Sequence, residues 1–154
     1  MPDAQSHPAT TPCPVRIELS DGSSVNGILW LLPDPSRASG STSLESLLDG
    51  TRDFLAIGLN SGGSQLISRH AIRTVEAAAS GPGTNELDSG SASLDVLTLR
   101  LDSGQEISGV LRAVAPDGAN RMSDIFNAPG RFIGLGVGDR YVLASKRHIV
   151  RVSF

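Results

Sequence analysis

Two short basic segments contain the residues best suited to bind an anion. Each places arginine or lysine beside histidine, with a further arginine four positions after the first arginine. Guanidinium and ammonium groups bind phosphate oxygens through charge and hydrogen bonds. We therefore expect these segments, together with one arginine close by, to form the candidate site for RNA, a nucleotide or another anion. The candidate residues are Arg69, His70, Arg73, Arg140, Lys146, Arg147, His148 and Arg151.

The same basic residues have a second interpretation that needs no ligand. Arginine and lysine on the polar face of an edge strand discourage other strands from pairing with it. Aromatic side chains for base stacking are also few, with four Phe, one Tyr and one Trp in the chain. Phe54 and Phe132 occupy matching strand positions, and we expect both to lie in the core.

Patterns for catalysis and metal binding are missing from the sequence. The three histidines and the single Cys13 lack the spacing of a zinc site. The run Gly134-x-Gly136-x-Gly138 precedes neither a helix nor the Lys-Ser/Thr pair of a phosphate-binding loop, so hairpin turns explain it better. We expect a protein that is not an enzyme and has no metal or cofactor.

An internal repeat organises the chain. Three blocks of the first half recur in the same order in the second half, at offsets of 82, 78 and 77 residues. The matched positions include Gly22 with Gly104, Phe54 with Phe132, and Leu66 with Leu143. Ordered matches of this kind indicate a tandem duplication.

Each repeat has the pattern of five short strands and one helix. Alternating apolar residues at 15–19 and 97–101 predict the first strands, followed by glycine turns at Gly22 and Gly104. Further strands are expected around 54–59, 65–68, 132–137 and 141–145, with last strands ending near Val75 and Val152. Short helices with N-caps at Thr42 and Asn120 are expected between strands two and three.

The predicted fold is mainly β, with two tandem small bent five-stranded barrels that each carry a short helix between strands two and three. Gly27 and Gly109 predict a bulge or a sharp bend at the second strand of each barrel. The expected organisation is a disordered tail over 1–14, unit one over 15–75, a flexible linker over 76–94 and unit two over 95–154.

Composition excludes several classes of protein. The chain has 154 residues and a net charge of -3, so it is not a polycation that binds any nucleic acid. One cysteine excludes an intramolecular disulfide. No apolar run approaches the roughly 20 residues that span a bilayer, and residues 1–14 lack the apolar stretch of a secretion signal. We expect a cytoplasmic protein with no membrane partner.

Two motifs resemble those of the Sm-like family. One pattern is similar to the first Sm motif and occurs twice, as Leu19-x-x-Gly22-x-x-x-x-Gly27-x-Leu29 and as Leu101-x-x-Gly104-x-x-x-x-Gly109-x-Leu111. A second segment is similar to a stretch of the bacterial Hfq branch of that family: Ser68-Arg69-His70-Ala71-Ile72-Arg73-Thr74-Val75. The resemblance implies bent five-stranded barrels, ring formation through edge strands and, in many members, RNA binding.

The chain departs from that family in several places. Hfq-like chains place their helix before the first strand, whereas here the expected helix lies between strands two and three. In unit two, Arg147 falls at the family's histidine position. The spacing Arg69-x-x-x-Arg73 also resembles the paired arginines of PilZ domains, which bind a cyclic dinucleotide. The Asp/Asn-x-Ser-x-x-Gly motif of that family does not follow here.

Two functions are consistent with these patterns. The first is a non-enzymatic Sm-like interaction and assembly module, a scaffold that binds protein partners or self-associates through edge strands. The alternative is an RNA- or nucleotide-binding protein that uses the basic last hairpin of each unit. The slightly acidic composition and the scarce aromatics favour the first, and the net charge of +3 over 97–152 favours the second.

Overall fold

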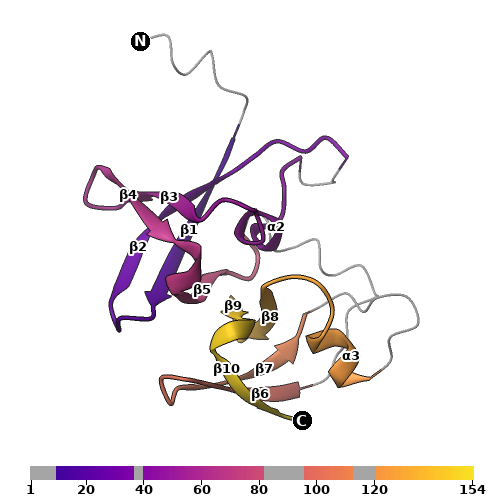
Figure 1. Cartoon of the computed structure of the whole chain (residues 1–154). Helices are drawn as coiled ribbons and strands as arrows, with labels where there is room; N and C mark the ends of the chain where they lie inside the picture. Colours follow the sequence, from indigo (N-terminus) through magenta and orange to yellow (C-terminus); the bar gives the residue numbers. More distant parts are fainter. Residues whose placement is uncertain (1–9, 37–39, 82–95, 113–120) are drawn as a thin grey trace, which may run out of the picture.

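The computed structural model describes residues 10–36, 40–81, 96–112 and 121–154. Within these ranges the protein is mainly β, with ten antiparallel strands in one open sheet and two short α-helices (Figure 1). The first repeat contains β1 (Thr11–Leu19), β2 (Ser24–Leu31), α2 (Leu44–Leu48), β3 (Phe54–Leu59), β4 (Ser64–Ser68), the 3-10 turn η1 (Arg69–Ala71) and β5 (Ile72–Ala78). The second contains β6 (Val96–Leu101), β7 (Glu106–Leu111), α3 (Met122–Phe126), β8 (Phe132–Val137), β9 (Arg140–Ser145), η3 (Lys146–His148) and β10 (Ile149–Ser153).

The strand order contains the same pattern twice. It runs β10-β6-β7-β8-β9-β5-β1-β2-β3-β4, so in each repeat the fifth strand pairs with the first and the fourth lies at the opposite end. At the centre, β9 of the second repeat pairs with β5 of the first. We call this junction the seam. The mainly β prediction is confirmed, but two separate barrels are not, because the repeats share one continuous sheet.

Glycines shape the first hairpin of each repeat in the same way. Gly22 and Gly104 both have a φ of 90°, which confirms the predicted turns because this conformation strains residues with a Cβ. Of the predicted bulge or sharp bend at Gly27 and Gly109, the bulge is wrong, because the β1–β2 and β6–β7 pairings pass these residues without a register shift. A Cβ at Gly27 would overlap the carbonyl of Gly58 on β3, so glycine permits close approach of two strands. The register shift lies instead in the β1–β5 pairing, at Glu18 and Leu19.

The helices lie between strands two and three, as predicted. Ser43, rather than Thr42, is the N-cap of α2, because its Oγ accepts a hydrogen bond from the Ser46 amide at 3.0 Å. Arg121 precedes α3 and provides no side-chain cap. The predicted cap Asn120 lies outside the described residues.

Two predicted boundaries need correction. Residues 11–14 belong to β1 and not to a tail, since Thr11 pairs with Leu31 and Cys13 is buried in the core. Similarly, β5 continues to Ala78 and takes the first residues of the predicted linker into the sheet. Residues 82–94 of that linker lie outside the described part of the chain.

The core of the first repeat includes side chains from the second. Phe132, Tyr141 and Leu143 pack into the cluster that contains the first repeat's own apolar residues. A separate cluster holds the remaining core of the second repeat. Phe132 is therefore buried, as predicted, whereas its equivalent Phe54 is 56% exposed, contrary to the prediction, because no strand covers the outer side of β4.

The matched positions Leu143 and Leu66 allow a test of the burial at the seam. Leu143 is fully buried and its repeat equivalent Leu66 is 70% exposed. We expect Leu143→Ala to lower the free energy of unfolding by about 2–5 kcal/mol, because it leaves a cavity in the joined core. Leu66→Ala should cost less than about 0.5 kcal/mol in dilute protein. Urea unfolding followed by circular dichroism measures both, and equal losses would contradict burial of Leu143 at the seam.

Candidate functional site

The seam is built from strand pairing and from ion pairs at its ends. Five residue pairs join β5 to β9, from Thr74 with Ala144 to Ala78 with Arg140. The Ala79 amide donates to the carbonyl of Asp139 at 2.9 Å and continues the pairing beyond the strands. Arg140 Nε lies 3.3 Å from Glu76 Oε1, so this candidate residue joins the repeats through an ion pair.

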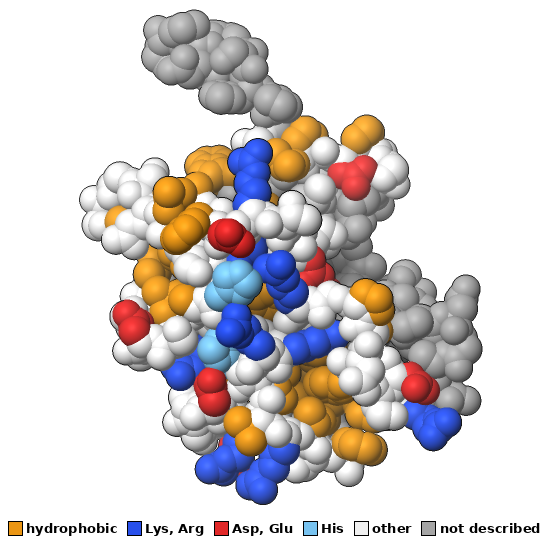
Figure 2. Space-filling model, in the orientation of Figure 1, with side chains coloured by type: hydrophobic (Ala, Val, Ile, Leu, Met, Phe, Trp, Pro, Cys, Tyr) orange, Lys and Arg blue, Asp and Glu red, His pale blue; other side chains and the backbone are white. Residues whose placement is uncertain are grey.

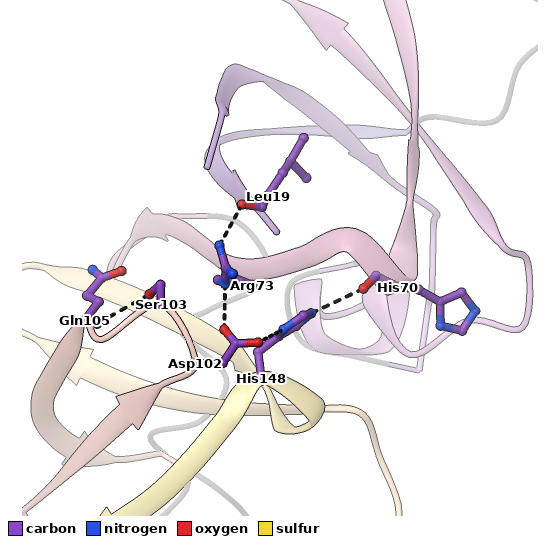
Figure 3. A network of polar contacts seen from close by, with 7 residues as sticks. All are labelled: Leu19, His70, Arg73, Asp102, Ser103, Gln105 and His148. Carbon is purple, nitrogen blue, oxygen red and sulfur yellow. Dashed lines mark hydrogen bonds and ion pairs between the residues drawn. The ribbon is translucent and has the colours of Figure 1, made fainter. Parts of the chain in front are cut away.

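A polar network connects the repeats at the other end of the seam (Figure 3). Asp102, in the turn between β6 and β7, accepts from Arg73 Nε on β5 and pairs with His148 Nδ1, both at 2.7 Å. His148 Nε2 lies 3.3 Å from the carbonyl of His70 in the first repeat. Hydrogen bonds from His148 and then from Arg73 hold the pKa of Asp102 below its usual value. Arg73 also donates to the carbonyl of Leu19 at 3.2 Å.

Two acidic side chains of the first repeat face the second repeat beside α2. Asp49 Oδ1 accepts from the backbone amide of Arg131 at 2.8 Å. Burial, and next the charge of Asp49, raise the pKa of Glu45 to about 7, while the Lys146 ammonium opposes this rise. Lys146 itself is partly buried and donates to the carbonyl of Ala128 at 2.7 Å.

A basic cavity opens between the repeats, with a volume of about 490 Å³. The first repeat contributes two lining residues from η1, and the second contributes the segment before β8, the end of β9 and η3. The lining residues are Arg69, His70, Gly130, Arg131, Phe132, Ser145, Lys146 and Arg147. In Figure 2, Lys, Arg and His side chains gather in the middle of the face that is drawn.

The eight predicted site residues divide into separate groups. Arg69, His70, Lys146 and Arg147 line the cavity, which unites the two predicted motifs. Arg73 and His148 belong to the Asp102 network, and Arg140 pairs with Glu76. Arg151 is exposed on β10, away from the cavity lining.

Sequence reasoning missed two important residues, Arg131 and Asp102. Arg131 lies outside both basic motifs, and only the pairing of β8 with β9 brings it beside them. Asp102 resembles an ordinary turn residue in the sequence. Its role depends on the neighbouring repeat, because Arg73 approaches it only across the seam.

The outermost strands, β4 and β10, form the two ends of the sheet. Apolar side chains are exposed near both ends: Phe54 and Leu66 in the first repeat, and Val150 and Phe154 in the second, with exposed fractions of 56%, 70%, 63% and 82%. Among the strands that the structure describes, none pairs with the outer edge of β4 or β10, so each end combines a free backbone edge with apolar surface, which is the arrangement that favours strand addition.

Comparisons with known proteins found no matching family model, curated protein or solved structure. Among the described residues, no cluster of three or more His, Cys, Asp and Glu side chains is arranged to hold a metal ion. None of the described helices has the length and apolar character needed to cross a membrane.

Glu45 makes the stability of the fold dependent on pH. Its pKa is raised from 4.5 to about 7 in the folded protein, so the folded state binds its proton more tightly than the unfolded state does. This contribution to stability is complete below pH 4.5 and decreases as pH rises to about 7. We expect Glu45→Gln to raise the melting temperature at pH 8 by about 5–10 °C relative to its effect at pH 5, because only at pH 8 does the substitution remove an ionised, partly buried carboxylate. Equal effects at both pH values would contradict the raised pKa.

Proposed function

We propose that this chain is a non-enzymatic, Sm-like assembly module that self-associates head to tail. In this proposal β10 of one copy pairs with β4 of the next copy, in the manner of β5 with β9 at the seam. The observation that carries it is the matched pair Leu143 and Leu66. Leu143 is fully buried where a fifth strand covers its edge, and Leu66 is 70% exposed where none does.

The alignment of the two repeats predicts which residues would lie opposite one another in this contact. Val75 lies opposite Leu143 at the seam. The residue equivalent to Val75 is Val152, at an offset of 77, and the residue equivalent to Leu143 is Leu66. Val152 of one copy would therefore lie opposite Leu66 of the next. Val152 already packs against the second core cluster, so Leu66 of the neighbouring copy would extend that core as Leu143 extends the first.

The contact between copies differs from the seam in its polar groups. At the seam, Arg73 faces Asp102 and His148. The equivalent of Arg73 is Val150, and the equivalents of Asp102 and His148 are Ser20 and Ala71. The proposed contact thus replaces an ionic network with small or apolar side chains. Its stability then depends on buried apolar area and backbone hydrogen bonds, so salt should affect it weakly.

A head-to-tail contact joins two different surfaces, and this limits the kinds of assembly that can form. Such heterologous contacts form a closed ring when the rotation between copies closes, and an open filament when it does not. A rotation of less than 180° between copies, as between the strands of a twisted sheet, gives a product larger than a dimer. We therefore expect the full chain to form species above twice its 16.0 kDa mass as concentration rises.

The experiment is sedimentation velocity on the full chain and on two matched variants. Leu66→Glu places a charge on the β4 edge and should leave only monomer. Leu32→Glu is the control, because Leu32 is 55% exposed and lies beyond the end of β2, away from both free edges. We expect Leu32→Glu to assemble like the unaltered chain. A monomeric unaltered chain, or equal loss of assembly in both variants, would refute head-to-tail pairing through β4.

A further inference from the structure

Four of the eight residues that line the basic cavity are arginine or lysine, and none of the eight carries a carboxylate. Arg69, Arg131, Lys146 and Arg147 all line it. Two carboxylates nearby, Asp49 and Asp53, have other contacts: Asp49 accepts from the Arg131 backbone amide, and Asp53 lies 3.7 Å from His70 Nε2. The lining residues thus provide net positive charge, which Glu45, Asp49 and Asp53 offset only from outside the lining.

Arg69 is the most deeply buried of these cations, with 6% of its surface exposed. Its two terminal nitrogens donate to the carbonyls of Arg52 and Leu47, and its Nε has no hydrogen-bond partner in the described structure. Burial and the charges of Arg131 and Arg52 lower the pKa of Arg69. A buried guanidinium beside other cations, with an unsatisfied Nε–H, is costly; Asp53 offsets part of this cost, and an anion in the cavity would offset more.

Arg147 contacts His70, and no ion pair joins Arg147 to a carboxylate of the described residues. A guanidinium only donates hydrogen bonds, so His70 Nδ1 must accept from Arg147 Nη1, which lies 2.8 Å away. This contact positions Arg147 at the cavity without neutralising it. Arg131 is exposed and forms no ion pair with any carboxylate in the described ranges. Both arginines therefore have donors available for an oxyanion.

The size and lining of the cavity indicate the class of ligand. A volume of about 490 Å³ suits a small molecule. Its aromatic residue, Phe132, is 2% exposed and offers no open face on which a base could stack. We infer that this cavity binds the phosphate group of a small phosphorylated molecule, with Arg69, Arg131, Lys146 and Arg147 as the groups that contact it.

Isothermal titration calorimetry of the full chain with pyrophosphate tests this inference. We expect saturable binding at one site per chain, weakened by salt. The double variant Arg131→Ala with Arg147→Ala should bind at least about tenfold more weakly, because it removes two charge-assisted contacts. The control is Arg100→Ala with Arg121→Ala, which removes the same charge from side chains that are 42% and 81% exposed and lie outside the cavity. This control should bind like the unaltered chain.

Three results would overturn the inference: no binding of pyrophosphate at low salt, equal weakening in the two double variants, or binding of short RNA without binding of pyrophosphate. Arg131 and Arg147 are both exposed, so we expect the double variant to fold. Melting curves of the variants check this. One chain supplies the whole lining, so Leu66→Glu should retain pyrophosphate binding. Failure of assembly and failure of phosphate binding are therefore distinguishable.

Discussion

The pairing of β5 with β9 is the contact on which the rest of this structure depends. Each repeat by itself has two open sheet edges, and a unit of this size buries little apolar surface. Joining one edge from each repeat pairs both backbones and buries Phe132 and Leu143 in the core of the first repeat. The two repeats thus share a sheet and part of a core, and the remaining open edges lie at the ends of the ten-stranded sheet.

The same pairing creates the polar features of the molecule. It brings η1 of the first repeat beside η3 of the second, so that Arg147 reaches His70 and the basic cavity forms between them. It also places Asp102 between Arg73 and His148. A strand contact specified by hydrogen bonds and apolar packing thereby assembles charges that are far apart in the sequence, and both proposals depend on this geometry.

The two five-strand segments differ in accordance with their positions in the sheet. Where the repeats meet, the fourth strand carries Tyr141 and Leu143, whereas the free fourth strand carries Ser64 and the exposed Leu66. The polar network has the same asymmetry, because Asp102 and His148 correspond to Ser20 and Ala71. The seam therefore combines strand pairing with an ionic network, whereas the β4 edge carries an exposed apolar side chain without the equivalent ionic groups. This difference suits an outer contact that forms reversibly.

The strands, the helices between strands two and three, and the turns at Gly22 and Gly104 could be predicted from the amino-acid sequence. These features depend on local patterns, namely alternating burial, helical spacing and the positive φ of glycine. The tertiary structure alone decided which edges pair, and therefore why Phe132 is buried while Phe54 is exposed. It also separated Arg140 and Arg151 from the cavity and added Arg131 to it. Edge pairing depends on contacts between residues distant in the chain, and local periodicity contains no information about them.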